Sequence, residues 1–221
     1  MQWTVFADVP AEDLRPVLAI ARRRTFRRGE VVFHQHDPAD SLHLIVSGRF
    51  AVRTSTQLGE ESLLSIRGPD DVFGELALVS GEPRTATVVA LEPSETLTVH
   101  RTDFDGLRGR RPEVDRMLVL LLARALARMD ELLAESYYVT AERRVVRRLL
   151  DAAETYGGRA PDTEIPLTQE QLASLAGASR QTVSAVLSRE RRRGTIDLGR
   201  GRVILRDPTA LARRAGLPPP T

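Results

Sequence analysis

The feature that most constrains the fold is a series of short apolar runs between residues 30 and 100, each bounded by turn residues. The runs are "EVVFH", "SLHLIVSG", "RFAVRTS", "ESLLSI", "DVFG", "RTATVVAL" and "ETLTVH". Between them lie segments such as "HDPAD", "SGR", "RGPDD" and "SGEP", which carry the Gly, Pro and Asp that tight turns need. Short strands at this spacing are typical of an antiparallel sandwich or barrel. The sequence therefore predicts one small antiparallel β-barrel over residues 23–100.

Two helical patterns flank this region. A short amphipathic helix is expected over "AEDLRPVLAIARRR", residues 11–24. A long helix is expected from Pro112, a residue suited to a helix start, to about Tyr138. In the long helix, apolar and small residues recur at spacings of four and three, the pattern of a two-stranded coiled-coil seam. The predicted seam consists of Leu118, Leu122, Ala125, Met129, Leu132, Ser136 and Val139.

This seam predicts a dimer. The alternative is that the same stripe packs on the chain's own barrel, which a single helix can also do. We favour the dimer because Leu121 and Leu133, which lie off the seam, can make the intramolecular contact instead.

The last third of the chain has the signals of a winged helix-turn-helix. A helix over roughly residues 141–156 ends at a Gly pair, and the loop "RAPDTEIP" follows. Thr168 and Gln171 form a capping box for a short helix, and Ser179 caps a second helix after a tight turn at Gly177. The segment "TIDLGRGRVILRD" then predicts a two-stranded wing with a Gly-rich turn.

Composition limits the classes of site. The 221 residues, 42% of them hydrophobic, suffice for two modest domains or one large one, so we expect a folded, soluble protein. Because there is no Cys, disulfides and zinc-thiolate, haem-thiolate and iron-sulfur sites are excluded. The first residues lack the pattern of a signal peptide, and no stretch is long and apolar enough to cross a bilayer. We therefore expect a cytoplasmic protein with no membrane partner.

Charge is unevenly distributed, although the formal net charge is only +2. All 32 basic residues are Arg. Residues 140–221 carry 15 Arg against 9 acidic residues, whereas residues 1–139 carry 17 Arg against 21 acidic residues. The basic surplus therefore lies in the part predicted to form the winged helix-turn-helix.

The stretch "FGELALVSGEPRTATV", Phe73 to Val88, has residue types suited to a cyclic phosphodiester attached to a ribose. A Gly followed by a short helical turn exposes backbone amides that favour an anion. Arg84 can grip phosphate oxygens, Thr85 can donate its hydroxyl, and Glu75 can accept from a ribose hydroxyl. The alternative is a surface turn in which Glu75 and Arg84 simply pair across a hairpin, a contact of about 0 to 1 kcal/mol.

The segments "GELAL" and "PRTATV" resemble the phosphate-binding cassette of cyclic-nucleotide-binding domains. Joined to the long helix and the winged helix-turn-helix, nearly the whole chain resembles the family of the cyclic-AMP receptor protein and the fumarate-nitrate reduction regulator. The resemblance implies an α+β protein with three parts. These are a jelly-roll-like, antiparallel β-barrel effector domain (1–111), a long dimerisation helix (112–139) and a winged helix-turn-helix DNA-binding domain (140–221).

Carried over to this chain, the resemblance implies that Glu75 binds the ribose 2′-hydroxyl while Arg84 and Thr85 hold the phosphate. The residues that would line the cassette are Gly74, Leu76 and Ala77. Family members that bind cyclic AMP reach the adenine with a Thr-Ser pair on the long helix, one residue from each subunit. Met129 and Asp130 occupy these positions, so the pair is missing.

The missing Thr-Ser pair affects only the expected recognition of the base, and the expected phosphate and ribose contacts are unchanged. Asp130 can accept from the adenine amino group or from guanine N1 and N2, and Thr85 resembles the Thr that cyclic-GMP domains place beside their Arg. Cyclic AMP is the first expectation for the effector and cyclic GMP the second. A ligand-independent DNA-binding regulator is the third, because the Thr-Ser pair is absent.

The second helix of the helix-turn-helix carries the residues expected to contact DNA. Those placed to reach bases are Arg180, Gln181 and Ser184, and those placed to bind phosphates are Ser179 and Thr182. Family members with the helix "SRETVGR" read a guanine-rich half-site, whereas this chain has "SRQTVSA" and should not share that operator fully.

The run "RERRRG", residues 189–194, follows this helix. It can be an ordinary solvated face. We expect it instead to lie along the phosphate backbone, with Arg189 and Arg192 as sequence-independent contacts. The resemblance further implies a homodimer on a palindromic operator of double-stranded DNA, with RNA polymerase as a partner.

Metal binding and catalysis are not expected. His34, His36 and His43 have no Cys or further ligand at a suitable spacing, and we interpret them as surface or partly buried strand residues. A nucleotide-processing enzyme would need a cluster of carboxylates or His near the phosphate clamp, and no such cluster is visible in the sequence.

Overall fold

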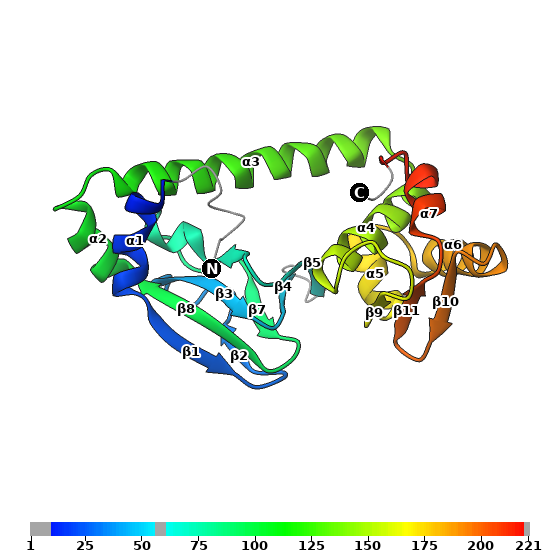
Figure 1. The fold of residues 1–221 in the computed structure, drawn as a ribbon, viewed down its shortest axis with the longest axis horizontal. Helices are drawn as coiled ribbons and strands as arrows, with labels where there is room; N and C mark the ends of the chain where they lie inside the picture. The colour runs from blue at the N-terminus through cyan, green and yellow to red at the C-terminus, as the bar shows by residue number, and fades with distance from the viewer. Residues whose placement is uncertain (1–9, 56–60, 219–221) are drawn as a thin grey trace. The chain divides into compact units, whose positions relative to one another are not determined.

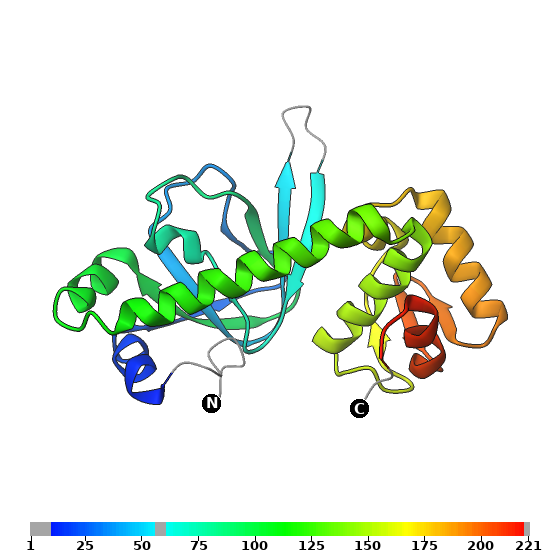
Figure 2. The same cartoon turned by 90° about the horizontal axis from the view of Figure 1, so that it is seen from above.

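The protein is described by a computed structural model that covers residues 10–55 and 61–218. The described residues form two compact units, one within residues 10–55, 61 and 65–131 and the other of residues 62–64 with 132–218. The boundary falls inside the helix α3 (Val114–Tyr138), which Figures 1 and 2 both show as one unbroken helix. The predicted ranges 1–111 and 140–221 include residues 1–9, 56–60 and 219–221, which lie outside the described residues.

The first unit contains two four-stranded sheets, in the orders β1-β8-β3-β6 and β2-β7-β4-β5. Their strands are β1 (Arg22–Phe26), β2 (Val31–Phe33), β3 (Ser41–Ser47), β4 (Phe50–Ser55), β5 (Glu61–Arg67), β6 (Val72–Phe73), β7 (Thr87–Ala90) and β8 (Ser94–His100). β8 pairs antiparallel with β1 and β3, β3 with β6, and β7 with β2 and β4. The antiparallel architecture is confirmed, while the strands described here form two sheets and no closed barrel.

β3 is buried on both faces, which explains its continuous apolar run. Leu42 and Leu44 belong to a cluster that also holds residues of the helices α1 (Ala11–Ile20), α2 (Arg101–Arg108) and α3. Ile45 packs in a second cluster with Phe50 and Val88 of the other sheet. Side chains of a strand alternate between its faces, so one face of β3 meets the helices and the other meets the second sheet.

The N-terminal helix is shorter than the sequence predicts. α1 ends at Ile20, and Arg22–Phe26 form β1, whose Arg22 lies opposite Thr98 of β8. Arg23 also pairs with Glu95 of β8 at 2.6 Å. An Arg-rich strand shows no apolar alternation, so its pairing partner, over 70 residues away, decides its structure. The helix α2 was not predicted either, and it places Phe104 and Leu107 in the first cluster.

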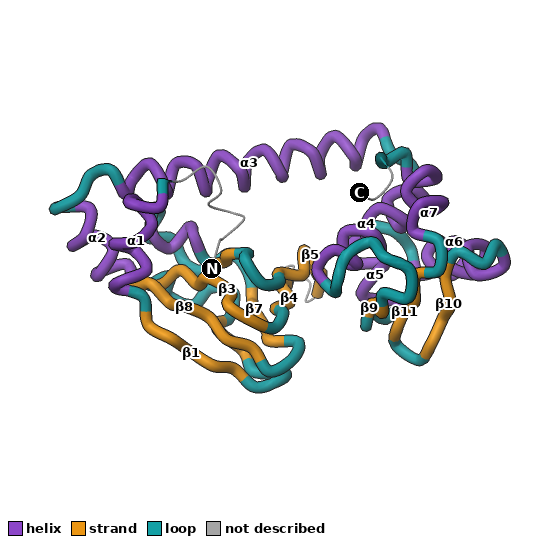
Figure 3. Tube along the Cα trace, in the orientation of Figure 1, coloured by secondary structure: helices purple, strands orange, loops and turns teal. Residues whose placement is uncertain are grey.

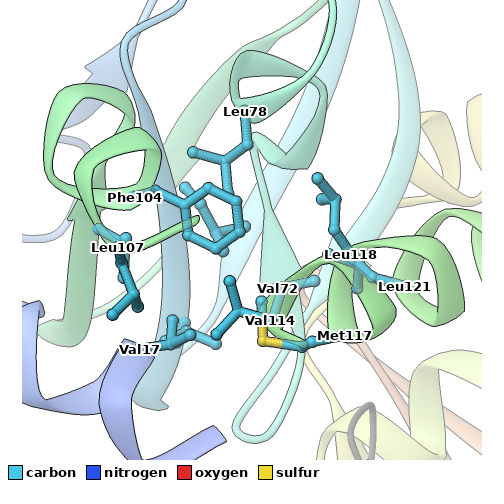
Figure 4. Packing of buried hydrophobic residues seen from close by; sticks show 12 residues of the cluster. Val17, Val72, Leu78, Phe104, Leu107, Val114, Met117, Leu118 and Leu121 are labelled. Carbon is cyan, nitrogen blue, oxygen red and sulfur yellow. The ribbon is translucent and has the colours of Figure 1, made fainter. Parts of the chain in front are cut away.

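The first half of α3 packs on its own unit. Val114, Met117, Leu118 and Leu121 are buried in the first cluster, which also holds Phe104 and is drawn in Figure 4. Leu121 thus makes the predicted intramolecular contact. Leu118 was placed on the dimer seam, but only 5% of its surface is exposed. That assignment is wrong, because Leu118 fills the chain's own core.

Other apolar residues of α3 are open to solvent. Val119, Leu126, Met129 and Leu133 are exposed by 63, 60, 66 and 54%. Leu133, the second residue that the sequence offered for an intramolecular contact, is thus more than half exposed. Val119, Leu126 and Leu133 are seven residues apart, and Met129 lies between the last two. The exposed stripe keeps Met129 of the predicted seam but has Val119 and Leu126 where Leu118 and Ala125 were predicted, while Leu122 packs against the first cluster.

The second unit holds a three-stranded sheet of order β10-β11-β9 and four further helices among its described residues. The elements are α4 (Ala141–Thr155), β9 (Glu164–Ile165), α5 (Gln169–Ala176), α6 (Arg180–Arg192), β10 (Ile196–Gly199), β11 (Arg202–Leu205) and α7 (Pro208–Ala215). Figure 3 shows the three strands side by side next to the helices. The predicted winged helix-turn-helix is confirmed, with β9 and α7 as additions.

Local signals placed the helix-turn-helix correctly. Thr168 and Gln171 form the predicted capping box at the start of α5. Gly177 ends α5 in the left-handed conformation, with φ of 53°, and the Ser179 side chain caps α6 by accepting from the Thr182 amide. No helix in the described part of the chain is long and apolar enough to span a membrane.

Candidate ligand pocket and DNA interface

A pocket in the first unit brings together most of the predicted ligand residues. Its walls include Gly74, Glu75, Leu76, Arg84 and Thr85. Apolar side chains from the two sheets, among them those of Phe33, Val52, Val72 and Val88, complete the walls. The short 3₁₀ helix η2 (Glu75–Leu78) and the segment before β7 therefore carry the polar part of the pocket.

Three predicted ligand residues are not gathered there. Ala77 lies within η2, but its side chain is outside those described. Met129 and Asp130 lie on the exposed part of α3 and are not among the described residues that line the pocket.

Arg84 is held in place by the strand β3. Its Nη1 donates to the Ser41 carbonyl at 2.7 Å and to the Gly74 carbonyl at 3.4 Å. Its Nη2 donates to Asp40 Oδ1 at 3.2 Å and to Ser41 Oγ at 2.9 Å. The guanidinium carbon also lies 3.9 Å from the centre of the Phe33 ring. The hydrogen bonds therefore hold the Nη edge of the guanidinium, and the Phe33 ring covers one of its faces.

One donor of Arg84 is left over. Arg84 is only 5% exposed, and its buried Nε has no hydrogen-bond partner among the described residues. Burial lowers the pKa of Arg84, and the Asp40 carboxylate opposes this shift. An Arg side chain is not deprotonated in proteins, so the group is cationic. A buried N–H without an acceptor costs roughly 1 to 3 kcal/mol, which an incoming acceptor would recover.

The alternative reading of the stretch, a simple Glu75–Arg84 pair, does not match the geometry. The ion-pair partner of Arg84 among the described residues is Asp40, which directly precedes β3. Glu75 instead lines the pocket, half-buried, at the first position of η2. The acidic and the basic residue therefore both line the pocket, and the interactions of the described residues do not include an ion pair between them, although the nearby Glu75 charge also acts to raise the pKa of Arg84.

Gly74 is required by the packing around Arg84. Its φ of 79° lies in the left-handed region. A Cβ atom at this position would lie 2.7 Å from Arg84 Nη1 and 2.9 Å from the Ser41 carbonyl oxygen. Any larger residue would therefore displace the guanidinium. Leu78 anchors η2 in the first cluster, while Leu76 remains 42% exposed.

His43 lies behind Arg84 and is fully buried, which corrects the expectation of a surface or partly buried residue. Its Nδ1 is 3.1 Å from Thr96 Oγ1 and 3.2 Å from Thr98 Oγ1, and its ring stacks on Phe73. Burial, followed by the nearby Arg84 charge, lowers the pKa of His43 to about 3, so the imidazole is neutral. No three His, Asp or Glu side chains within the described ranges are arranged to hold a metal.

The exposed start of α6 presents the predicted base-reading residues. Arg180, Gln181 and Ser184 are all exposed, together with Ala185. Arg180 forms an ion pair with Glu170 of α5. The Ser179 and Thr182 hydroxyls lie 2.9 Å apart and contact each other at the helix start. One side of α6 can thus enter a groove while its other side, with Val183, Val186 and Leu187, is buried.

The run at residues 189–194 does not follow α6, as the sequence predicted, but forms its last turn and the two residues after it, and it serves two purposes. Arg189 donates to Glu142 of α4 at 2.9 Å, so it joins two helices in addition to any contact with DNA. Glu190 is buried and pairs with Arg193 and with Arg214 of α7, each at 2.9 Å. Arg192 is exposed, and the described residues give it no ion-pair partner. Arg189 therefore fixes α6 to α4, and Glu190 fixes it to α7.

Sequence reasoning missed the residues that position the two sites. Asp40 and Ser41 hold Arg84, and nothing in their local pattern indicates this role. Arg144 of α4 donates to the Ala176 carbonyl and the Gly177 carbonyl, both at 3.0 Å, and so caps the end of α5. A single Arg in an Arg-rich helix gives no signal for such a contact.

Comparison with known proteins identifies both units. Residues 23–111 match the family model of the cyclic nucleotide-binding domain, and residues 143–214 match that of the Crp-like helix-turn-helix domain. The chain is 36% identical, over 193 residues and 86% of each protein, to a CRP-like cAMP-activated global transcriptional regulator of Mycobacterium tuberculosis. It is 34% identical to the cyclic AMP receptor protein of Thermus thermophilus, over 94% of each protein.

The same similarity extends to solved structures. A CRP-family transcriptional regulator from Thermus thermophilus superposes with a TM-score of 0.73 at 27% identity. The match covers 88% of this chain and 97% of that one. The similarity thus includes the order of both units and the helix that joins them.

Proposed function

Because the chain belongs to the family of the cyclic-AMP receptor protein and the fumarate-nitrate reduction regulator, we propose that it is a homodimeric transcription regulator controlled by a cyclic nucleotide. It is a DNA-binding regulator with a cyclic nucleotide-binding domain and, like these relatives, not an enzyme. Cyclic AMP is the first candidate effector, on the precedent of the two relatives, and cyclic GMP is the second. The expected partners are a palindromic operator and RNA polymerase, in the cytoplasm.

The unpaired Nε of Arg84 is the observation that carries this proposal. Two carbonyls, a hydroxyl and a carboxylate use the Nη donors and leave the Nε–H as the donor still to be satisfied. An anionic oxygen in the adjoining pocket would complete the set with a charge-assisted bond. Thr85, exposed beside Arg84, can donate its hydroxyl to the same phosphate.

Glu75 supplies the discrimination between sugars. Its carboxylate is not neutralised by Arg84, so it can accept a hydrogen bond from a ribose hydroxyl. A deoxyribose would leave this acceptor unpaired. The carboxylate at the start of η2 and the cation on the segment before β7 thus select a ring that carries both a phosphate and a free hydroxyl.

The exposed heptad stripe of α3 supports the homodimer. Val119, Leu126, Met129 and Leu133 lie along one side of a helix whose first turns pack elsewhere. A row of exposed apolar side chains at this interval is the pattern that a second copy of the same helix covers. The twofold axis would then present two α6 helices to DNA.

Regulation follows from a shift in population between arrangements of the dimer. The cassette residues would bind an effector more tightly in the arrangement that places the two α6 helices one turn of DNA apart. In the free protein, Arg180 is paired with Glu170, and it must leave this exposed pair to reach a base. Such a pair is worth about 0 to 1 kcal/mol, so DNA can compete with it.

Calorimetry of the full chain with cyclic AMP and cyclic GMP tests the effector. The variant Arg84→Lys keeps the charge beside Asp40 but loses the Nε–H, so it should bind more weakly. If neither nucleotide binds, the second candidate stands: a ligand-independent regulator, which the exposed Met129 and Asp130 in place of a Thr-Ser pair favour.

A further inference from the structure

One polar residue of the pocket does not belong to the cassette. Glu75, Glu82, Arg84 and Thr85 lie on η2 or on the segment before β7. Among the described lining residues, Arg67 is the hydrogen-bonding side chain that comes from elsewhere, namely from the last position of β5. No role in phosphate or ribose binding has been assigned to it.

The neighbours of Arg67 leave its donors available. Its nearest acidic group is Asp71, with Nη1 and Oδ1 3.9 Å apart and both side chains about 40% exposed. Such a pair is worth about 0 to 1 kcal/mol. Asp71 is itself fixed, because its Oδ2 accepts from the Gly68 amide at 3.1 Å. The carboxylate therefore orients the guanidinium without using up its five N–H groups.

The remaining pocket wall suits a flat base. Val52, Val72 and Val88 offer apolar surface, and none of them can hydrogen-bond to a ring edge. Once Glu75 and Arg84 have taken the ribose and the phosphate, the base is the part of the ligand that Arg67 can contact.

We propose that Arg67 contacts the base of the bound nucleotide and shifts preference toward purines that carry an oxygen at position 6. The planar fork of Arg matches two adjacent acceptors, and guanine presents O6 and N7 on one edge. Adenine presents N7 beside an amino donor, so the same fork can make one good contact and meets a donor with the other. This inference rests on the proposed function, because it assumes that a cyclic nucleotide occupies the pocket.

Three probes separate the base edge from the rest of the ligand: cyclic AMP, cyclic GMP and cyclic IMP. Cyclic IMP has the oxygen at position 6 but lacks the guanine amino group. The experiment measures their affinities by calorimetry for the full-length protein and for Arg67→Met. The matched control is Arg53→Met on the neighbouring strand β4. Arg53 is also 3.9 Å from an acidic partner, Glu61, and it does not line this pocket.

In the Arg67→Met variant, affinity for cyclic GMP and cyclic IMP should fall on the order of 10- to 100-fold, with a much smaller effect on cyclic AMP. The Arg53→Met variant should behave like wild type. Arg67→Lys, which keeps the charge without the fork, should lose most of the same preference. If Arg67→Met does not fold, Arg67→Lys supplies the comparison.

Two results would overturn the base contact alone. Equal weakening of all three nucleotides would mean that Arg67 contacts the phosphate, and unchanged affinities for all three would mean that it contacts no part of the ligand. Failure of the wild-type protein to bind any of the three would instead overturn the proposed function, and the base contact with it.

Discussion

The exposed stripe on α3 yields a quantitative expectation for the variant Leu126→Glu. Leu126 is 60% exposed in the single chain. Complete burial of a Leu side chain is worth roughly 1.5 to 3 kcal/mol, so covering the open part of Leu126 would contribute about 1 to 2 kcal/mol per subunit. Both copies together would contribute about 2 to 4 kcal/mol, which corresponds to roughly 30- to 1,000-fold in the dimer dissociation constant. The carboxylates of Leu126→Glu add desolvation and like-charge repulsion to this loss.

Sedimentation velocity over a concentration series measures the effect. The variant Leu126→Ala should weaken the dimer within the stated range, and Leu126→Glu should be monomeric. Ala127→Glu is the matched control, because it places the same charge on an exposed position about 100° around the helix. The reasoning is refuted if Leu126→Glu dimerises like wild type, or if Ala127→Glu disrupts the dimer equally.

Three further expectations concern the pocket, the recognition helix and acid stability. Arg84→Lys should weaken cyclic nucleotide binding by about 1.5 to 3 kcal/mol, measured by calorimetry, and should also lower the thermal midpoint, because Lys cannot replace all the Nη hydrogen bonds to Ser41, Gly74 and Asp40. If Arg84→Lys and the wild-type protein bind the nucleotide with equal affinity, the contact between Arg84 Nε and the ligand is excluded. Arg180→Ala should relax specificity at one base pair of each half-site in a selection from random DNA, whereas Arg192→Ala should weaken all sequences alike and reduce the salt dependence. Identical selected motifs for Arg180→Ala and wild type would exclude base reading. His43, whose folded pKa of about 3 lies below its unfolded value near 6.5, should contribute stability that is complete above pH 6.5 and lost as the pH falls toward 3. The loss, on the order of 5 kcal/mol, should be absent from His43→Gln in denaturant titrations across this pH range.

The parts of the fold that could be predicted depend on neighbouring residues. The caps at Thr168 and Ser179 are hydrogen bonds within three residues, so the local sequence contains both partners. The short strands between turn residues were predicted for the same reason. Gly74 and Arg84 could be assigned to one pocket because their motif is contiguous.

The missed features depend on partners distant in the chain. β1 is a strand because Arg22–Phe26 pair with β8, although its own residues show no alternation. The contact between Asp40 and Arg84 spans 44 residues. The seam was displaced because α3 has apolar residues at both Leu118 and Val119, and the sequence does not say which of the two faces the chain's own core.

The central claim is that a cyclic nucleotide controls sequence-specific binding to DNA. The most direct test measures the affinity of the full-length protein for its selected palindromic operator, at fixed salt, with and without saturating cyclic AMP or cyclic GMP. A coupling free energy of about 1 to 3 kcal/mol is typical of such control, so at least one nucleotide should tighten operator binding roughly 5- to 150-fold. The same affinity in the absence and presence of both nucleotides would contradict the claim.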